Sequence, residues 1–511
     1  MMATARTLPL WSPVDEATRG WFLEGPVDEV QDVVVIGAGI AGLTTALCLC
    51  REGRRVLVID RAGIGAGETL RTTAHLASAL DDRYYRLARQ HGEDGARLAA
   101  ASHSAAIDWI EELALGAGSP CGFRRIPGYL FSHDGDLDAL RREAEAARAA
   151  GLSAEYLAEG AETPAVLGPV VRFDQQARVD MGLYLLALAK AVRDAGGGFL
   201  RAEATAVEGG VQPLVRLRDG ELRAAAVVVA SNVPFHETGA TYMKQAAYRS
   251  YVVAGEAPAD ALPDALYWDD GDPYHYVRLQ MPGDASGPVQ VIVGGEDHKT
   301  GQDDDPTAYV RLQEWTRARF PQITRFTHAW SGQILEPVDS LAFIGADPDN
   351  DNVYLVTGDS GNGITHGTLA GLLISDLIQA RDNPWAGLYD PARKPVRGGG
   401  EWLRENANAA LQYRDWVRPG EVSSAGEIAR GTGAVLRRGL HRIAAYRSAD
   451  GQLHAFNARC PHLGCVVRWS SEEKSWDCPC HGSRFDAASG AILNGPTSEP
   501  LAHVRWEEGG D

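Results

Sequence analysis

Two short boxes of cysteine and histidine near the carboxyl end carry the residues with the clearest chemistry. The first box is Cys460-Pro-His462, and the second is Cys478-Pro-Cys480-His481. Such pairs can give one iron two thiolates and a second iron two imidazoles, which makes a [2Fe-2S] cluster with mixed ligands. Imidazoles are neutral where thiolates are charged, so this cluster accepts an electron readily. We therefore expect Cys460, His462, Cys478 and His481 to bind iron, and the chain to carry electrons.

Two other kinds of site use the same residue types. A four-ligand zinc site also takes Cys and His at short spacing. Cysteines can also form an oxidised scaffold without metal. Six matching positions in two boxes, counting Cys465 and Cys480, favour the iron cluster over both alternatives.

The carboxyl-terminal part of the chain resembles Rieske proteins of the quinol-oxidising type. The two boxes carry this resemblance, together with residues 482–486 and Asn494-Gly495-Pro496, and it covers residues 418–511. It implies a disulfide between Cys465 and Cys480 that joins the two cluster loops.

One position departs from the pattern of the resembled family. High-potential Rieske proteins place a Tyr two residues after the Ser that follows the second box, whereas this chain keeps Ser483 but has Phe485. Because hydrogen bonds to ligand sulfur raise the potential, we expect the cluster to lie below the top of the Rieske range.

A second set of residues, near the amino end, could bind a dinucleotide. An apolar run over residues 32–36 leads into Gly37-Ala-Gly39-Ile-Ala-Gly42 and then into a helical stretch over 43–51. The first glycine permits a tight turn, the second lets the backbone approach the pyrophosphate, and the third lets helix and strand pack closely. A second strand, over 55–59, ends at Asp60, whose carboxylate can accept hydrogen bonds from a ribose.

Later segments favour FAD over NAD. Residues 61–75 are rich in Gly and Thr and can wrap the pyrophosphate and ribityl chain. Another apolar strand, over 352–358, precedes a glycine-rich turn and a predicted helix over 369–380, whose start can face the flavin end of the cofactor. The expected contacts in these segments are Arg61, Thr72, Thr73, Gly358, Gly361, Gly363 and Thr365.

From about residue 32 to residue 381 the sequence resembles the D-amino-acid-oxidase-like family of FAD-dependent oxidoreductases, which contains glycine and sarcosine oxidases. A narrower resemblance is to a bacterial branch in which this module is fused to a Rieske domain. Residues 72–76, 229–235, 248–252 and 294–302 carry it. The fold implied is an α/β FAD-binding Rossmann-type domain with an inserted, mainly antiparallel substrate-domain sheet, followed by an all-β Rieske domain.

The residues between the FAD segments should select the substrate. Short runs of β-branched and aromatic residues over 128–132, 265–268, 274–280 and 289–294 predict antiparallel strands. In the resembled family such a sheet floors a pocket over the flavin, where an Arg, Lys or Tyr holds a substrate carboxylate. Each candidate could instead be a surface charge or a packed ring. The candidates are Arg249, Tyr251, Tyr274, Tyr276, Arg278, His298, Lys299 and His366.

His75 raises a separate question. Some relatives attach flavin covalently through a nearby His, so the sequence leaves covalent and non-covalent binding open.

These motifs divide the chain into parts. We expect an extension over 1–30, the FAD module over 31–381, a linker with a short helix (401–413) over 382–417, and the Rieske domain over 418–511. Within the module, the FAD-binding segments should be about 31–80, 176–236 and 330–381, and the substrate-domain segments about 81–175 and 237–329.

Composition excludes some kinds of partner. The 511 residues carry a net charge of −19, which argues against nucleic acid and anionic membranes. No apolar run approaches the ~20 residues that span a bilayer, and the first 28 residues lack the pattern of a secretory signal. We therefore expect no integral membrane segment and a cytoplasmic location.

The two cofactors together favour a dehydrogenase. FAD takes two electrons at once, whereas a [2Fe-2S] cluster carries one, so the fusion suits a two-electron oxidation followed by one-electron export. The resemblance implies oxidation of an amine or amino acid at the carbon next to nitrogen. The electron acceptor would be a quinone, cytochrome or ferredoxin-like carrier, reached from the histidine-ligated iron that Rieske domains expose.

Three other functions compete with this hypothesis. A reductase component would relay electrons without its own organic substrate, but no second glycine fingerprint for NAD(P)H occurs. A Rieske oxygenase needs a mononuclear iron, and no Asp-x-x-His-x4-His pattern is found. A redox sensor without turnover would use the same cofactors.

Overall fold

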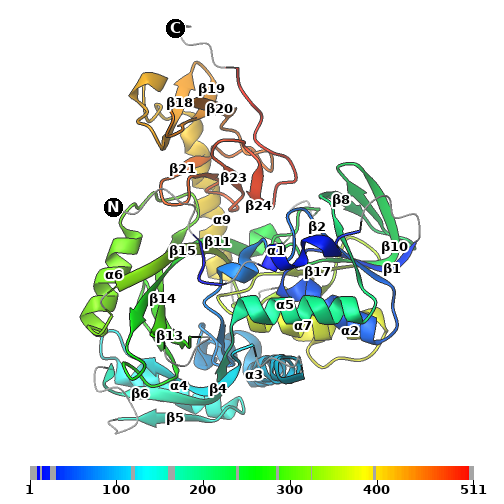
Figure 1. Ribbon diagram of the computed structural model, residues 1–511, viewed down its shortest axis with the longest axis vertical. Coiled ribbons are helices and arrows are strands. Elements are labelled where there is room, and N and C mark those ends of the chain that lie inside the picture. Colours follow the sequence, from blue (N-terminus) through cyan, green and yellow to red (C-terminus); the bar gives the residue numbers. More distant parts are fainter. Residues whose placement is uncertain are drawn as a thin grey trace.

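The computed structural model describes residues 8–11, 14–23, 30–116, 121–158, 167–236, 241–282, 287–323, 325–394 and 399–505. They form two large sheets with their helices and a smaller all-β domain, which lies at the top of Figure 1. The predicted fold class is confirmed.

The first large sheet is the parallel sheet that the glycine pattern predicts. β1 (Gln31–Ile36) lies between β2 (Val56–Asp60) and β10 (Gly220–Val229) and pairs in parallel with both. The sheet order is β16-β17-β10-β1-β2-β7, and only β16 runs antiparallel to its neighbour among these described strands. The remaining strands are β7 (Gly198–Arg201), β16 (Phe343–Ala346) and β17 (Val353–Thr357), extended by β8 (Ala204–Glu208) and β9 (Leu214–Leu217).

Both faces of this sheet are covered, which explains the continuous apolar run of β1. α2 (Ile40–Arg51) contacts α5 (Met181–Asp194) and α7 (Gly363–Ile378), and their apolar side chains share a core with Val33 and Val35. Alternate residues of β1 face the β8–β9 hairpin on the other side.

One helix begins earlier than predicted. α7 starts at Gly363, whereas the apolar pattern predicts a start at 369. Gly and β-branched residues weaken the local helix signal over its first turn. The turn is nevertheless buried, so tertiary packing decides where the helix begins.

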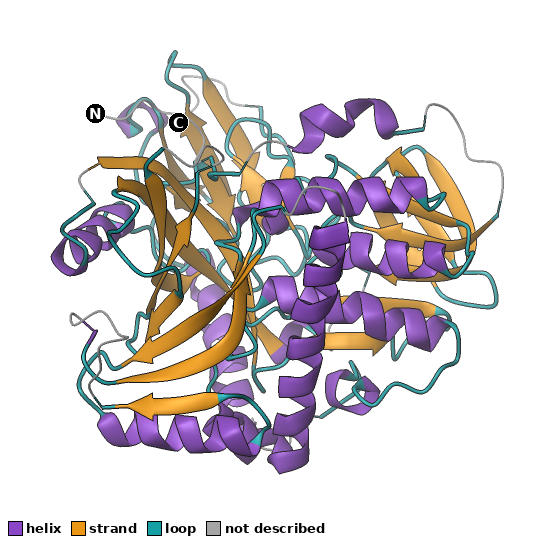
Figure 2. Ribbon diagram, turned by 60° about the horizontal axis from the view of Figure 1, so that its bottom comes forward, coloured by secondary structure: helices purple, strands orange, loops and turns teal. Residues whose placement is uncertain are grey.

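The second large sheet curves beside the helices (Figure 2). Its order is β15-β11-β14-β13-β12-β4-β6-β3, with β5 also on β6, and β12 with β4 is the one parallel pair among its described strands. The predicted strands are confirmed, and each end lies within five residues of its predicted position. The bounds are β3 (His75–Leu76), β4 (Arg124–Phe131), β5 (Ala154–Leu157), β6 (Val170–Arg178), β11 (Gln245–Ala257), β12 (Leu266–Asp269), β13 (His275–Gln280), β14 (Val289–Lys299) and β15 (Arg325–Pro337).

The C-terminal domain consists of two small antiparallel sheets. The first contains β18 (Thr432–Arg438), β19 (His441–Arg447) and β20 (Leu453–Asn457). The second contains β21 (Arg468–Ser470), β22 (Ser475–Asp477), β23 (Arg484–Asp486) and β24 (Ile492–Asn494). α9 (Gly399–Leu411) leads into this domain and continues as the 3-10 helix η5 (Gln412–Trp416), close to the predicted linker helix.

The remaining elements connect these layers. α3 (Tyr84–Gly116) is bent at Gly92, where φ is +79°. The others are α1 (Val14–Thr18), η1 (Arg19–Trp21), η2 (Glu68–Arg71), α4 (Leu137–Ala149), η4 (Tyr242–Lys244), α6 (Ala308–Arg319), α8 (Ala386–Tyr389) and η6 (Ala425–Glu427).

Candidate functional site

A cavity of about 630 Å³ runs between the two large sheets. At one end its wall comes from the turn after β1 and from the end of β2, where Gly37, Gly39 and Asp60 lie. At the other end the wall comes from the start of α7 and from β11, β13 and β15 of the second sheet. The cavity therefore connects the glycine turn with the sheet that should select the substrate.

The glycine turn packs too closely against neighbouring backbone to hold side chains at Gly37 and Gly42. Gly37 has a φ of +111°, and a Cβ there would lie 2.3 Å from the Ala230 carbonyl oxygen. A Cβ on Gly42 would lie 1.9 Å from the Gly37 carbonyl oxygen, so this glycine lets α2 pack against the turn rather than lining the cavity. Gly39 precedes α2 and lines the cavity, so the start of the helix faces the place where an anionic phosphate can bind, although the Ile40 N–H already donates to the Thr69 hydroxyl at 3.1 Å.

Asp60 lines the cavity while it orders the neighbouring loops. One carboxylate oxygen accepts from the Ala38 N–H at 2.9 Å, and the other accepts from the N–H groups of Ala62 and Gly63 at 2.8 and 2.9 Å. Arg61 also lines the cavity, as do Thr72 and Thr73. The ribose contact predicted for Asp60 stays a prediction.

The second predicted FAD segment is only partly in the cavity wall. Gly358, Gly361 and Gly363 line the cavity. Thr365 is buried and is not among the described lining residues. Its hydroxyl contacts the ring nitrogen Nδ1 of His103 at 2.8 Å and donates to the Asn362 carbonyl at 3.1 Å.

Three of the eight substrate-pocket candidates line the cavity: Tyr274, Tyr276 and His366. The hydroxyl of Tyr274 lies 3.5 Å from a carboxylate oxygen of Asp81, and that of Tyr276 lies 2.8 Å from the hydroxyl of Ser250. These four residues form part of the wall at the end where the sequence predicts the substrate. His366 is buried, and burial lowers its pKa to about 4, so its ring is neutral at pH 7.

The other five candidates lie outside the described cavity lining, with partners elsewhere. Arg249 donates to the Ser331 hydroxyl at 2.9 Å, and Arg278 donates to the Thr73 carbonyl at 2.6 Å. Lys299 pairs with Glu405 of α9. Tyr251 packs against the rings of Tyr309 and His298, at centroid distances of 4.9 and 5.5 Å.

The sequence pattern does not reveal the acidic groups of the cavity. Asp81 and Asp359 line it, and burial raises their pKa values to about 6 and 7. His75 lines it as well, with a pKa that burial and then Arg278 lower to about 3. Isolated acids in loops carry no periodic signal, so only their spatial convergence identifies them.

The four expected cluster ligands come together at the junction with the C-terminal domain. The rings of His462 and His481 lie 5.0 Å apart, and the side chains of Cys460 and Cys478 are buried and hydrogen-bonded to each other. The Nδ1 atoms of both histidines are buried without a hydrogen-bond partner among the described residues. Burial lowers the pKa of each ring to about 4, which leaves neutral imidazoles. Two neutral nitrogens and two thiols fit the mixed ligation of a [2Fe-2S] cluster.

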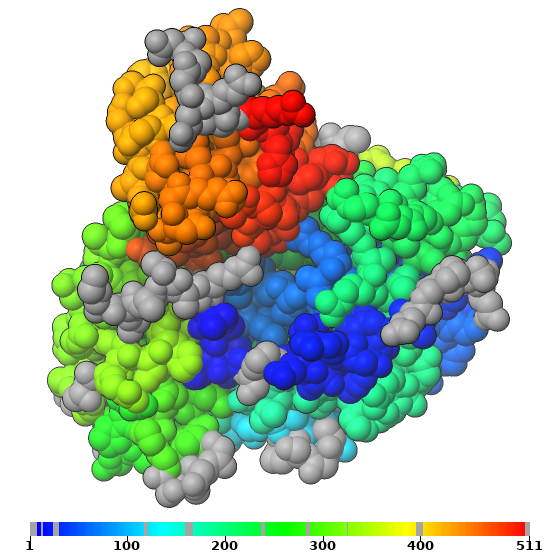
Figure 3. Space-filling view, turned by 45° about the horizontal axis from the view of Figure 1, so that its top comes forward, coloured from blue at the N-terminus to red at the C-terminus, as the bar shows by residue number. Residues whose placement is uncertain are grey.

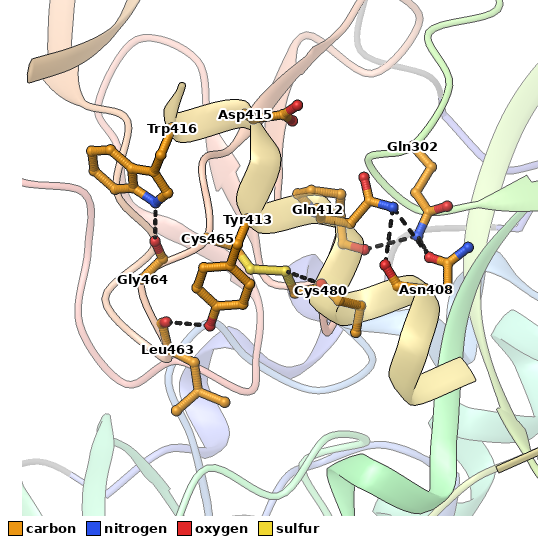
Figure 4. The surroundings of a disulfide bond; sticks show 12 residues. Gln302, Asn408, Gln412, Tyr413, Asp415, Trp416, Leu463, Gly464, Cys465 and Cys480 are labelled. Atoms are coloured by element: carbon orange, nitrogen blue, oxygen red, sulfur yellow. Dashed lines mark hydrogen bonds between the residues drawn. A yellow bond between two sulfur atoms is a disulfide. The ribbon is translucent and has the colours of Figure 1, made fainter. Parts of the chain in front are cut away.

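The predicted disulfide between Cys465 and Cys480 is confirmed. Its two sulfur atoms lie within 4.8 Å of the Cys478 sulfur. The end of the linker covers it, as Figure 4 shows. There Tyr413 donates to the Leu463 carbonyl at 2.6 Å, and the indole of Trp416 donates to the Gly464 carbonyl at 3.0 Å.

The histidines face the rest of the chain, whereas the sequence predicts that this end of the cluster is exposed. The ring of Tyr242 packs edge-on to His462 at 4.8 Å and to His481 at 6.3 Å. Tyr242 is buried and donates to the Pro234 carbonyl at 2.5 Å. The docking of the C-terminal domain on the two large sheets therefore half-buries both rings.

Two family models match the chain. The model described as FAD dependent oxidoreductase matches residues 32–377, and the Rieske [2Fe-2S] domain model matches residues 418–505. A Bacillus subtilis protein named as a Rieske 2Fe-2S iron-sulfur protein, YhfW, is 29% identical over 93% of this chain and 94% of its own length. The cytochrome b6-f complex iron-sulfur subunit of Prochlorococcus marinus is 30% identical over 29% of this chain and 78% of that protein.

Solved structures share the fold of the larger part. Glycine oxidase from Geobacillus kaustophilus superposes with a TM-score of 0.60 at 19% identity, covering 71% of this chain and 99% of that chain. L-proline dehydrogenase from P. horikoshii gives 0.58 at 18% identity, covering 72% and 98%. Across the described residues, no helix is both long and apolar enough to cross a membrane.

The two family models decide the assignment, since the first covers residues 32–377 and the second covers residues 418–505. The chain belongs to the FAD-dependent oxidoreductase family and carries a Rieske [2Fe-2S] domain at its carboxyl end.

Proposed function

We propose that this chain is a dehydrogenase that oxidises a carbon–nitrogen bond of an amine and exports the electrons singly to an external carrier. When bound, FAD supplies hydride acceptance and the [2Fe-2S] cluster supplies one-electron chemistry. The observation that carries the proposal is the single cavity that joins the glycine turn to a polar and aromatic substrate wall. Two fold neighbours are named as a glycine oxidase and an L-proline dehydrogenase, which supports oxidation at a carbon–nitrogen bond but not the choice of an amine.

The charge of the substrate wall favours an amine over an amino acid. Among the described lining residues the arginines are Arg61 and Arg71 and lysine is absent, while Asp81 lies beside Tyr274 and Gly361. Arg71 donates to the Ser331 carbonyl at 2.6 Å and lies 3.7 Å from Glu473, so it is already engaged. An ammonium group can be bound by the Asp81 carboxylate and by the faces of tyrosine rings, whereas a carboxylate needs a free cation.

The protein groups position the substrate and exclude water. Tyr276 packs against the neutral ring of His75 at 5.4 Å and is held by Ser250, so this wall is rigid. Rigid aromatic walls fix the substrate carbon next to nitrogen at the reacting position. After it binds as the ammonium ion, the substrate must lose a proton before oxidation, and the low-dielectric surroundings favour the neutral amine at that step.

An anaerobic titration tests this function. Holoprotein with one FAD and two irons per chain is mixed with NAD(P)H and with pairs of compounds, each an amine and the amino acid that differs from it only by the α-carboxylate. Flavin bleaching is followed for each compound. Bleaching by an amine but not by its amino-acid partner supports the proposal. Bleaching by NAD(P)H alone would indicate a reductase component, and no bleaching by any compound would leave a redox sensor as the better description.

A second experiment tests the role of the cluster ligands. Cys460→Ser and His481→Ala should preserve flavin bleaching by substrate and abolish reduction of an external one-electron acceptor. Wild-type turnover with the acceptor in both variants would contradict electron export through the Rieske domain. The acceptor class, whether quinone, cytochrome or ferredoxin-like carrier, and the cytoplasmic location stay predictions.

A further inference from the structure

The Rieske domain supplies part of the wall of the dinucleotide cavity. Six residues of one short segment line it together with the glycine turn: Ile492, Leu493, Asn494, Gly495, Thr497 and Ser498. We call residues 492–498 the closing segment. In Figure 3 the red C-terminal part of the chain lies next to the blue amino-terminal part.

Hydrogen bonds hold the closing segment against the residues that follow β2, from Arg61 to Glu68. Arg61 donates to the Leu493 carbonyl at 2.5 Å. The amide nitrogen of Asn494 donates to one carboxylate oxygen of Glu68 at 2.8 Å, and the other oxygen of Glu68 accepts from the Gln333 N–H at 2.8 Å. The segment is therefore tied to both large sheets.

A buried network of charged side chains also contacts the closing segment, through the side chain of Asn494. The amide oxygen of Asn494 accepts from Arg484 at 3.1 Å, and Arg484 pairs with Asp477 and Glu473. Glu473 also accepts from the Ser331 hydroxyl at 2.5 Å, so the network crosses the domain boundary. The neighbouring guanidinium groups hold the pKa of Glu473 at about 2 despite its burial. Breaking a buried network of this kind is costly, so the domain docks in one position.

We propose that the closing segment is part of the FAD-binding site and covers the end of the cofactor next to Asp60 and Arg61. FAD then enters and leaves only when the Rieske domain lifts from the cavity. By reciprocity, bound FAD holds the domain in its docked position. This inference requires FAD but no particular substrate, so it stands or falls separately from amine oxidation.

The test uses full-length holoprotein and the isosteric variant Asn494→Asp. This change sets a second carboxylate against Glu68 and removes the donor between them, and like charges at this distance repel. We expect FAD to be released at least tenfold faster, measured as the recovery of flavin fluorescence after dilution. Iron content and the cluster absorbance should stay at wild-type values. Asn457→Asp is the matched control, because Asn457 lies in the same domain and its side-chain oxygen accepts from the Arg459 N–H, away from the cavity.

A double variant sharpens the test. In Asn494→Asp with Glu68→Gln, the new amide can donate to the new carboxylate while its oxygen still accepts from Gln333. Slow FAD release should return in this variant. Release at the wild-type rate in Asn494→Asp, or equal acceleration in Asn457→Asp, would overturn the inference.

A measurement on the unmodified chain covers the case in which Asn494→Asp does not fold. Hydrogen–deuterium exchange of residues 492–498 should slow when FAD is restored to deflavinated protein. Equal exchange with and without FAD would also overturn the inference. Failure of the protein to bind any FAD would instead contradict the cofactor assignment itself.

Discussion

The side-chain amide of Gln333 donates a hydrogen bond of 3.1 Å to the carbonyl oxygen of Gly482, the residue that follows His481. Gln333 also lines the cofactor cavity, and its amide oxygen is buried without a partner among the described residues. Gly482 permits this approach, because a Cβ there would lie 2.3 Å from the Cβ of Ala247. One side chain thus spans the distance between the cavity and the loop that carries a cluster ligand.

Gln333→Leu should weaken the connection between the two cofactor sites. The change removes one buried hydrogen bond and leaves the Gly482 carbonyl without its donor, a loss of about 1–3 kcal/mol. This loss weakens docking of the cluster loop on the cavity wall, so we expect cluster reduction after light-driven reduction of the flavin to slow, by up to about tenfold for each 1.4 kcal/mol by which docking is weakened, as followed by EPR. Iron content should not change.

Gln302→Leu is the control for this prediction. Gln302 also donates to a carbonyl of the cluster loop, Pro479, at 3.0 Å, but it is not among the described residues that line the cavity. Equal slowing in both variants would mean that these bonds only hold the domains together.

Asp81→Asn should weaken binding of an amine substrate. A hydrogen bond to a charged group contributes about 1.5–3 kcal/mol, so KM should rise about 10- to 100-fold. Burial raises the pKa of Asp81 to about 6, and its charged form is therefore lost as the pH falls through that value. KM of the wild-type protein should rise below pH 6, and Asp81→Asn should not show this rise. A KM for amines that Asp81→Asn leaves unchanged would contradict the proposed substrate class.

The local parts of the site could be predicted from the sequence. The strand, glycine turn and helix around Gly37 are contiguous, and the cluster boxes place four ligands on two short loops. Their chemistry depends on neighbours in the chain, so spacing and periodicity are enough to identify them.

The long-range parts could not be predicted. Arg249 is the kind of cation that binds a substrate carboxylate, yet it lies buried beside Ser331 at the domain junction. Arg61 and Leu493 are bonded across 432 positions of sequence. Such contacts depend on how domains dock, and no local pattern in a single sequence reports that arrangement.

The linker should protect the disulfide from reduction. Tyr413 and Trp416 hold the loop with Leu463 and Gly464 over Cys465, and the Cys480 sulfur faces the Ala409 carbonyl at 3.6 Å. In folded holoprotein we expect no free thiol at Cys465 or Cys480 under a mild thiol reductant. Tyr413→Phe combined with Trp416→Phe removes both bonds but keeps an aromatic ring at each position, and should expose the disulfide to reduction. Alkylation followed by mass spectrometry measures this, and two alkylated thiols in the wild-type protein would refute the prediction.

Phe485→Tyr should raise the reduction potential of the cluster. Phe485 is fully buried in the core that contains Cys460 and Cys478. The side chain of Ser483 already makes a hydrogen bond to the Cys460 sulfur. A tyrosine hydroxyl there can donate to a ligand sulfur and stabilise the additional negative charge of the reduced cluster. We expect a rise of tens of millivolts, since ~60 mV is about 1.4 kcal/mol for a one-electron couple.

An EPR-monitored redox titration of the full chain measures this potential separately from that of the flavin. Phe456→Tyr adds the same hydroxyl to another fully buried position of the same core, beside His503, and is the matched control. Because the ring of Phe456 packs on His503, with 4.7 Å between the ring centroids, we expect the potential of the control to stay near the wild-type value. A potential that is unchanged or lowered in Phe485→Tyr would mean that this ring does not reach the cluster, and the low potential expected for this domain would then need another cause.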